Sequence, residues 1–465
     1  MNELRLYNTL TKQVERIAAS DERFTVYFCG PTVYDYAHIG NFRTYLVEDV
    51  LIRVLKLSGY RPFVARNITD VDDKTIRDSQ KVGMKLSEFT EKYTEIFHAD
   101  CDKLNILQPD VEPRAAAHIG EQISMIRRLI ERGHAYESDG SVYFRVSSFE
   151  KYGHLSNVYG RELQTQDFDS AGKRNMADEY DRESVADFVL WKARKPEDGE
   201  NFWPSPWGDG RPGWHIECSA MSIKYLGETI DLHAGGVDLC FPHHENEIAQ
   251  SEACTGKQFV RHWMHIAHLM VDGAKMSKSL GNMYTLNDIE KAGFSADVLR
   301  YCLISGHYRQ PLNFTMNGLN AAASALKKLA KYGEIFDEIL EPELPQCPKS
   351  WTFLGEAYEA LLDDLNVPLC LGCVFKFFGN FDAKGLNSGQ EAALAKEFFA
   401  LKHALGLRLE REVVSIPDGI RELANARWEA KSRGNYALAD ELRVQVEASG
   451  WMIEDSKLGF TVVRK

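Results

Sequence analysis

The stretch FTVYFCGPTVYDYAHIGNFRTYLVEDVLIRVLKLSGYRPFVARNI, residues 24–68, decides the fold class. Residues 24–29 are mostly β-branched or aromatic and stop at a Gly-Pro turn, which predicts a buried strand. Apolar residues then recur at helical spacing through residues 43–58, and residues 62–68 return to a strand pattern. Strand, helix and strand in this order predict a right-handed βαβ unit, with a ligand crevice beyond the carboxyl end of the first strand.

The rest of the chain extends this α/β pattern. Residues 229–234 have the composition of another buried strand, residues 242–254 that of a helix with Pro in its first turn, and residues 295–410 are helical. A polar stretch rich in Gly, Asp, Pro and Trp over 160–210 indicates an insertion. We therefore predict an α/β fold in which a Rossmann-type parallel-sheet domain with an insertion is followed by α-helical C-terminal domains.

Composition excludes several classes of protein. The 465 residues predict about two to four domains. With 55 Lys and Arg against 68 Asp and Glu, the net charge is −13, which disfavours a non-specific coat on nucleic acid or an anionic membrane. No apolar run is long enough to span a bilayer, and the first residues do not have the pattern of a secretory signal. The nine cysteines are few and irregularly spaced, so we expect a reduced, cytoplasmic location.

Two motifs have the chemistry of phosphate binding. His38-Ile-Gly40-Asn41 lies between the first strand and the long helix, where free N–H groups of a helix N-terminus attract phosphate and Gly40 lets a nucleotide approach. Lys275-Met-Ser-Lys278-Ser lies in a Gly-flanked basic loop that can close over a triphosphate. Each motif alone is more typical of an ordinary turn or a solvated loop. The pattern Gly208-x-Gly210-x-x-Gly213 follows no strand pattern and is predicted to be a loop.

Together, the two motifs resemble the paired signatures of class I aminoacyl-tRNA synthetases, and the chain resembles the cysteine-specific family, the cysteinyl-tRNA synthetases, over nearly its whole length. The stretches that carry this resemblance are CGPTVYDYAHIGN (29–41), NITDVDDKTI (67–76), EPRAAAHI (112–119), GWHIECSAMS (213–222), DLHAGGVDLCFPHHENEIAQSEA (231–253), KMSKSLGN (275–282) and ARWEAKSRGNYALADELR (426–443). The chain ends in GFTVVRK, where the family often has a Gly-Thr-x-Trp-Arg pattern.

The resemblance implies ATP-dependent ligation of L-cysteine to tRNA(Cys) through cysteinyl-adenylate, with Mg²⁺ accompanying ATP. By motif match, the catalytic residues are His38, Asn41, Lys275 and Lys278, and the ATP-binding residues are His38, Gly40, Asn41, Lys278 and His268. The amino-acid pocket is expected to include Gly30, Thr32, Thr69, Trp214, His233 and Asp238. Contacts with tRNA are expected from Arg427, Lys431, Asp440 and Asp455. His265 is a further candidate for a nucleotide contact.

A metal site is a third possibility. His243 and Glu247 are four residues apart and share a helix face, while Cys29 ends the first strand and Cys218 follows Trp-His. This spacing matches no compact zinc pattern, and by itself it is more typical of packed cysteines and a surface His/Glu pair. The resemblance implies that these four residues bind one Zn²⁺ per chain. A metal that binds the substrate as a thiolate would separate cysteine from serine without an editing domain.

The resemblance also implies the domain order. The predicted parts are the first half of the Rossmann catalytic domain (1–130), a connective insertion (131–210), the second half (211–265), a stem-contact region with the KMSKS loop (266–310), a helical bundle (311–410) and an anticodon-binding module (411–465). We expect a cytoplasmic monomer with no membrane partner. Two alternatives remain open: a cysteine ligase acting on an amino-sugar inositol in thiol biosynthesis, and a non-catalytic RNA-binding paralogue.

Overall fold

The structure is a computed structural model. It describes residues 3–19, 21–157, 187–276, 280–336, 339–342, 346–381, 386–409, 417–455 and 460–464. The chain divides into two compact units, Met1–Leu409 and Glu410–Lys465, which are described separately.

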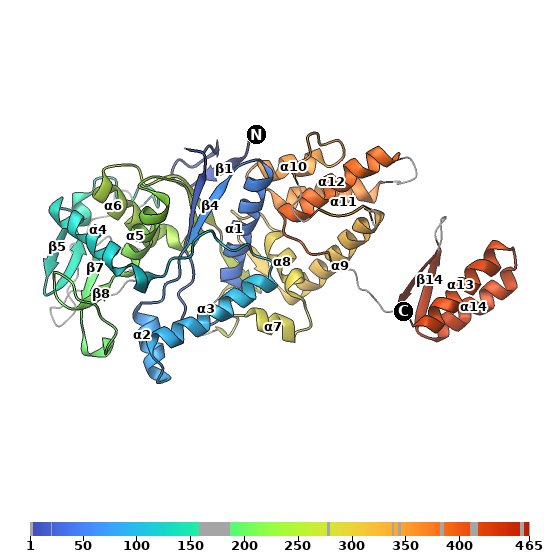
Figure 1. The fold of residues 1–465 in the computed structure, drawn as a ribbon, viewed down its shortest axis with the longest axis horizontal. Helices are drawn as coiled ribbons and strands as arrows, with labels where there is room; N and C mark the ends of the chain where they lie inside the picture. Colours follow the sequence, from blue (N-terminus) through green and yellow to red (C-terminus); the bar gives the residue numbers. More distant parts are fainter. Residues whose placement is uncertain are drawn as a thin grey trace. The chain divides into compact units, whose positions relative to one another are not determined.

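A four-stranded parallel sheet forms the centre of the first unit (Figure 1). Its strands are β3 (Phe24–Phe28), β4 (Pro62–Arg66), β9 (Ile230–Gly236) and β10 (Val260–Ile266), in the order β10-β9-β3-β4. In register, Tyr27 lies opposite Ala65 of β4 and His233 of β9. The predicted strand-helix-strand unit is therefore confirmed, and all four strands end at the same edge of the sheet.

Helix α1 (Ile39–Leu57) connects β3 to β4 and begins four residues before the predicted start at residue 43. His38 explains the earlier start, because it forms a reciprocal cap with Asn41. The His38 Nδ1 accepts the Asn41 N–H at 3.1 Å, and the Asn41 side chain accepts the His38 N–H at 3.1 Å. The helix is buried along most of its length and packs against α8 (Ala296–Ile304) and α12 (Ser388–Ala404).

The segment between β4 and β9 contains a second, antiparallel sheet, ordered β5-β6-β7-β8. Its strands are β5 (Ala135–Ser138), β6 (Ser141–Phe144), β7 (Phe188–Ala193) and β8 (Gly210–Pro212). The helices of this segment are α2 (Asp73–Lys81), α3 (Leu86–Lys103), α4 (Ile119–Glu131) and α5 (Trp214–Leu226). Helix α6 (Glu245–Thr255) follows β9, so the predicted helix over 242–254 begins three residues after Pro242.

The predicted glycine loop at residues 208–213 is wrong in its second half, where Gly210 begins strand β8. A Cβ at Gly210 would lie 2.3 Å from the Lys192 carbonyl oxygen, and one at Gly213 would lie 2.3 Å from that of Val189. These glycines therefore allow close backbone packing against β7.

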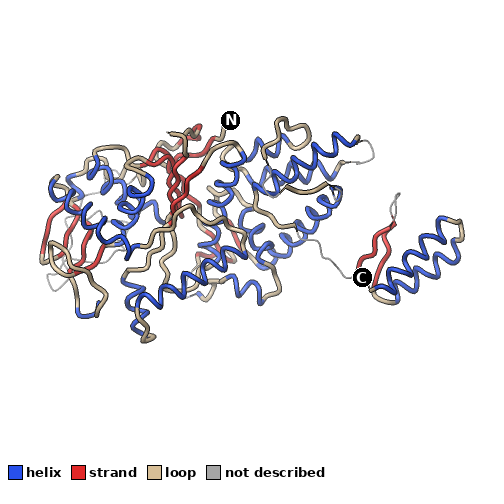
Figure 2. Tube along the Cα trace, viewed as in Figure 1, coloured by secondary structure: helices blue, strands red, loops and turns tan. Residues whose placement is uncertain are grey.

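The region after β10 is mostly helical, as Figure 2 shows. A small sheet of β11 (Leu269–Val271), β12 (Ala274–Lys275) and β13 (Leu312–Phe314) precedes the helical bundle. The remaining helices of this unit are α7 (Leu286–Lys291), α9 (Met316–Gly333), α10 (Gly355–Leu362) and α11 (Val367–Gly379), and a hairpin of β1 (Arg5–Asn8) and β2 (Gln13–Arg16) lies near its start. Among the described helices, none combines the length and apolar character that a membrane crossing needs.

The second unit contains α13 (Asp418–Ser432), α14 (Tyr436–Ala448), β14 (Trp451–Asp455) and β15 (Phe460–Arg464). The two strands pair antiparallel, with Trp451 opposite Arg464. The two helices agree with the helical module predicted from the sequence. The β14–β15 hairpin was not predicted. Ile420, Ala424, Val446, Trp451 and Ile453 form a separate small core, so both the helices and the hairpin contribute to it.

A buried charge cluster fixes α1 against the helical region. The Asp49 carboxylate accepts from Arg53 Nε at 2.7 Å and from an Arg300 guanidinium N–H, and its other oxygen accepts the Leu107 N–H at 2.8 Å. Burial alone would raise the pKa of Asp49, but the Arg300 and Arg53 guanidiniums lower it. Each of the three side chains is at most 3% exposed. Arg300 also donates to the carbonyls of Leu104 and Leu405, so the cluster joins three parts of the chain.

Replacing Asp49 with Ala should lower the free energy of unfolding by about 3–5 kcal/mol, because two guanidiniums would remain buried without their carboxylate. Urea denaturation of the wild type and the variant measures this difference. Asp78→Ala is the matched control. Among the described residues Asp78 forms ion pairs with the exposed Arg77 and Lys81, and its loss should change stability by less than about 0.5 kcal/mol. Because its folded pKa is lowered, the contribution of Asp49 is present at neutral pH and is lost as the pH falls through that pKa. Equal losses in the two variants would contradict this account.

Candidate active site

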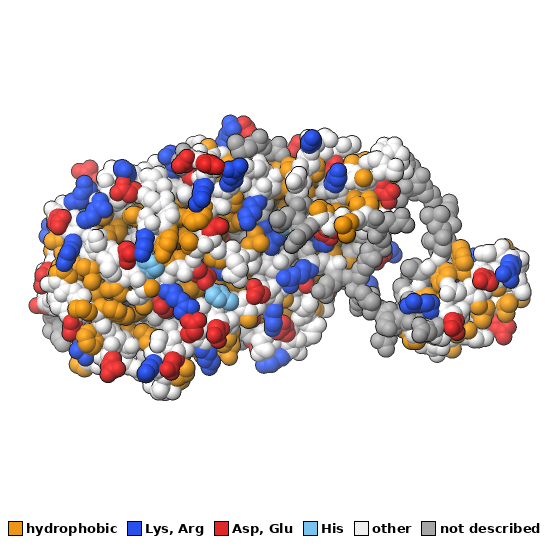
Figure 3. Space-filling view, viewed as in Figure 1, with side chains coloured by type: hydrophobic (Ala, Val, Ile, Leu, Met, Phe, Trp, Pro, Cys, Tyr) orange, Lys and Arg blue, Asp and Glu red, His pale blue; other side chains and the backbone are white. Residues whose placement is uncertain are grey.

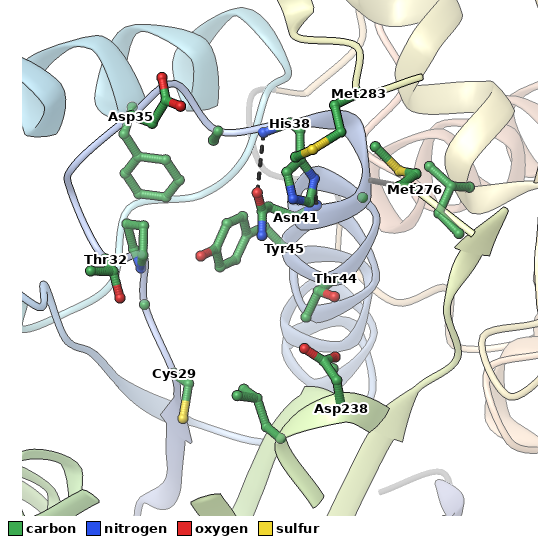
Figure 4. A pocket seen from close by; sticks show the side chains of 18 of the residues that line it. Cys29, Thr32, Asp35, His38, Asn41, Thr44, Tyr45, Asp238, Met276 and Met283 are labelled. Atoms are coloured by element: carbon green, nitrogen blue, oxygen red, sulfur yellow. Dashed lines mark hydrogen bonds between the residues drawn. The ribbon is translucent and has the colours of Figure 1, made fainter. Parts of the chain in front are cut away.

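A cavity of about 460 Å³ opens at the carboxyl end of β3, beside the first turn of α1 (Figure 4). Residues at and after the ends of β9 and β10 also line it, so it lies at the edge where the parallel strands end. The predicted site residues that line it are Cys29, Gly30, Thr32, His38, Gly40, Asn41, Trp214, Asp238, His268 and Lys275. Figure 4 shows Cys29 at one end of the cavity and His38 with Asn41 at the other.

The first turn of α1 fixes the proton position on His38. Since Nδ1 accepts the Asn41 N–H, a neutral His38 ring carries its proton on Nε2 and can donate it. A Cβ at Gly40 would lie 3.0 Å from the His38 ring and 3.1 Å from Met276 Sδ, so a side chain at this position would crowd both neighbours. The Asn41 N–H is capped by His38 and the Ile39 N–H donates to the Tyr284 carbonyl at 2.8 Å, so the His38 Nε2–H is the donor that this turn can offer to a phosphate group.

The four candidate metal ligands converge beneath this cavity. Cys29 follows β3, Cys218 is on α5, and His243 and Glu247 lie before and on α6; their donor atoms lie within 4.8 Å of one another, and all four residues are buried. The His243 Nε2 is 3.1 Å from Glu247 Oε1, and Cys29 Sγ is 3.9 Å from the same oxygen. Two thiols, an imidazole and a carboxylate form a donor set that suits tetrahedral Zn²⁺.

Electrostatics keep part of this cluster anionic. Hydrogen bonding to Cys29 lowers the pKa of the Cys218 thiol to about 6, although burial opposes this change. Burial would raise the pKa of Glu247, but His233 and His243 lower it to about 2. For Cys29 the direction is opposite, because burial raises its pKa well above the usual value. A cation bound between these donors would favour the thiolate form of both cysteines.

Comparison with known proteins matches this chain to one family of enzymes. Residues 16–324 match the family described as the tRNA synthetases class I (C) catalytic domain. A cysteine–tRNA ligase from Opitutus terrae is 49% identical over 99% of this chain and 98% of its own length, and one from Brachyspira hyodysenteriae is 42% identical over the full length of both.

The chain belongs to the cysteine–tRNA ligase family.

Solved structures show that this ligase shares its fold with other class I synthetases. A methionyl-tRNA synthetase from Mycobacterium tuberculosis, in complex with methionyl-adenylate, has a TM-score of 0.57 at 15% identity and covers 83% of this chain and 90% of its own. A leucyl enzyme from Agrobacterium radiobacter, in a complex titled LeuRS-tRNA-LeuAMS, has a TM-score of 0.56 at 12% identity and covers 83% of this chain and 84% of its own. At these identities the similarity concerns the fold alone.

Two predicted amino-acid contacts in this ligase lie behind the cavity and do not line it. Thr69 is buried, and its hydroxyl donates to Glu217 at 3.3 Å. His233 is fully buried, with Nε2 3.1 Å from Glu247 Oε2 and its ring stacked on Trp263. Both residues therefore support the cavity wall in this conformation. Lys278 lies outside the described residues.

Sequence reasoning missed a chain of hydrogen bonds behind the candidate metal ligands. His244 Nδ1 lies 2.8 Å from His265 Nε2, and His265 Nδ1 lies 2.8 Å from the Thr9 hydroxyl. On the other side, the His215 and His243 Nδ1 atoms are 2.8 Å apart, which directs His243 Nε2 toward Glu247. His265 does not line the cavity, so the predicted nucleotide contact has no support from this structure. The adjacent histidines of the PHHENE stretch were the available signal.

The predicted RNA contacts in the second unit differ in exposure. Asp440 is exposed, and Lys431 lies over the Trp428 ring at 5.7 Å. Arg427 is only 3% exposed, which corresponds to a packing role. The side chain of Asp455 lies outside the described residues.

Proposed function

We propose that this enzyme uses ATP to attach L-cysteine to tRNA(Cys) through cysteinyl-adenylate. The observation that carries the proposal is one cavity that is lined by the buried Cys29 and by His38, whose Nε2 carries a donor N–H. Membership of the family supports the same substrates. We further propose a cytoplasmic monomer with the domain boundaries predicted above.

The first reaction joins the two ends of the cavity. The cysteine carboxylate attacks the α-phosphorus of ATP, a new P–O bond forms, and pyrophosphate leaves with its bonding electrons. The His38 Nε2–H and Lys278 stabilise the charge on the transferring and leaving phosphates, and Lys275 helps to position the basic loop. Mg²⁺ would accompany ATP and supply further positive charge at its phosphates. Asn41 holds His38 in its donor form. Gly40 and His268 border the nucleotide.

The second reaction transfers the aminoacyl group. A hydroxyl of the terminal ribose of tRNA attacks the carbonyl carbon of the adenylate, and AMP leaves. No protein nucleophile is required, because the mixed anhydride is already activated. Asp238, at the cavity wall, pairs with the substrate ammonium group, while Gly30, Thr32 and Trp214 enclose the amino acid.

Zinc fits the donor set of Cys29, Cys218, His243 and Glu247, and when bound it supplies a Lewis acid that favours a thiolate ligand. The protein contributes the geometry. Trp214 lines the cavity and stacks on His243 with ring centres 4.3 Å apart, so it connects the amino-acid pocket to the ligand cluster. An overlapping set of Cys29, His233, His244 and Glu247 has one thiol fewer and suits zinc less well.

Charging of unfractionated tRNA with radiolabelled cysteine, ATP and Mg²⁺ tests the proposed function. We expect label on RNA that excess unlabelled serine does not dilute. Cysteine-dependent pyrophosphate exchange without labelled RNA would instead indicate the amino-sugar inositol ligase. Loss of both activities in zinc-replete protein would indicate the non-catalytic paralogue.

A further inference from the structure

One wall of the cavity has no ligand assigned to it. The cysteine is placed near Cys29, and ATP near His38, Gly40 and His268. The cavity is also lined by Tyr34, Tyr36, Lys74, Tyr93 and Phe97, which come from the β3–α1 loop and from helices α2 and α3. Figure 4 shows Thr32 and Asp35, from the same loop, on the side opposite Met276 and Met283. We call Tyr34, Tyr36 and Tyr93 the aromatic wall. They come from the β3–α1 loop and α3, whereas Lys275 and Met276 come from the segment that carries the basic loop.

The aromatic wall presents rings and cations together. Tyr36 is 49% exposed, and its ring packs edge-on against Tyr93 at 5.7 Å. Lys74 Nζ lies 5.7 Å from the centre of the Tyr34 ring, and Lys92 Nζ lies 5.4 Å from that of Tyr93. Phe89 supports Tyr93 from behind, with ring centres 5.0 Å apart. Supported, half-exposed rings interleaved with lysines are the arrangement by which proteins stack and neutralise unpaired nucleotides.

We propose that this aromatic wall binds the unpaired 3′ end of the tRNA and directs its terminal ribose toward the adenylate. The inference rests on the proposed function, because that reaction requires a third substrate to enter the same cavity. Figure 3 shows Lys and Arg intermingled with Asp and Glu over the face in view, without a broad basic band.

Substitutions at Tyr36 test whether the aromatic wall stacks on the 3′ end of the tRNA. Tyr36→Leu keeps apolar area but removes the ring, whereas Tyr36→Phe keeps the ring. We expect kcat/KM for tRNA in the charging reaction to fall about 5- to 100-fold in Tyr36→Leu, the range for one lost base–aromatic stack, and to stay within about twofold of wild type in Tyr36→Phe. Pyrophosphate exchange does not involve tRNA, so its rate in Tyr36→Leu should not show this loss of about 5- to 100-fold. Leu369→Ala, a 53% exposed position on α11 outside the cavity, is the control.

Binding of a tRNA that lacks its 3′ end tests which part of the RNA contacts the aromatic wall. Tyr36→Leu should bind tRNA(Cys) that lacks its unpaired 3′ nucleotides as tightly as wild type does, because the aromatic wall would contact only the removed part. Weaker binding of the trimmed RNA, or unchanged charging of intact tRNA, would overturn the inference. A rise in KM for ATP during exchange would assign the aromatic wall to the adenine base and also overturn it. Absence of charging by the wild-type enzyme would count against the proposed function itself, which is a separate result.

Discussion

The Cys29→Ser variant is expected to lose the proposed zinc and, with it, most of the proposed preference for cysteine over serine. Serine is a poor zinc ligand at this position, because its hydroxyl does not ionise near neutral pH as a thiol bound to metal does. Cys29 is also central to the cluster geometrically, since both overlapping donor sets include it. Its replacement removes a ligand from either set.

The size of the effect follows from the small difference between the two substrates. A pocket that distinguishes cysteine from serine by shape alone separates near-isosteres by about 10- to 200-fold. We therefore expect the ratio of kcat/KM for cysteine to that for serine, measured by pyrophosphate exchange, to fall into or below that range in Cys29→Ser. Elemental analysis should show one zinc per chain in wild type and none in the variant.

Cys373→Ser is the matched control, because Cys373 is a partly exposed thiol on α11, far along the chain from the cluster. It should retain both zinc and selectivity. Full cysteine activation by zinc-free Cys29→Ser protein would show that the metal has no part in selecting the substrate.

The second large effect is expected at His38, where stability and catalysis can be separated. Asn is among the best N-cap residues, so His38→Asn should preserve the start of α1 while removing the Nε2–H donor. We expect the unfolding midpoint to be nearly unchanged and kcat for pyrophosphate exchange to fall about 10²- to 10³-fold, the usual loss for one donor to a developing charge.

His38→Ala serves as the paired comparison. It removes the donor and the cap together, so it should show the same kinetic loss and an additional decrease of about 1 kcal/mol in the free energy of unfolding. Exchange at nearly the wild-type rate in His38→Asn would mean that His38 serves only as a helix cap.

The sequence predicted the parts of this site that depend on local pattern. The apolar periodicity before and after His38 was sufficient to place the cavity at the end of the first strand, because a βαβ unit leaves a crevice there. The start of α1 was set four residues too late, since a His–Asn reciprocal cap is a less familiar signal than one based on Ser or Asp. Likewise, His243 and Glu247 were paired by helical spacing and do contact each other.

Contacts between residues distant in sequence could not be predicted from local sequence pattern. Nothing local to Thr9, His244 or His265 indicates that three segments distant in sequence would bring them together. The burial of Arg427 also depends on how α13 packs in its unit, and a charged residue is exposed by default. The hairpin after Trp451 consists of two short strands, and pairing of so few residues leaves a weak pattern.

The wide separation of Cys29, Cys218 and Glu247 along the chain has a thermodynamic consequence. A compact ligand motif can chelate metal even in an unfolded chain, and that competing affinity reduces the stabilisation of the native state. Here the donors meet only when the strands and helices that hold them are assembled, so a denatured chain offers no comparable chelate. A metal ion held there would therefore stabilise the folded enzyme by nearly its full binding free energy, and the melting temperature would follow the free metal concentration.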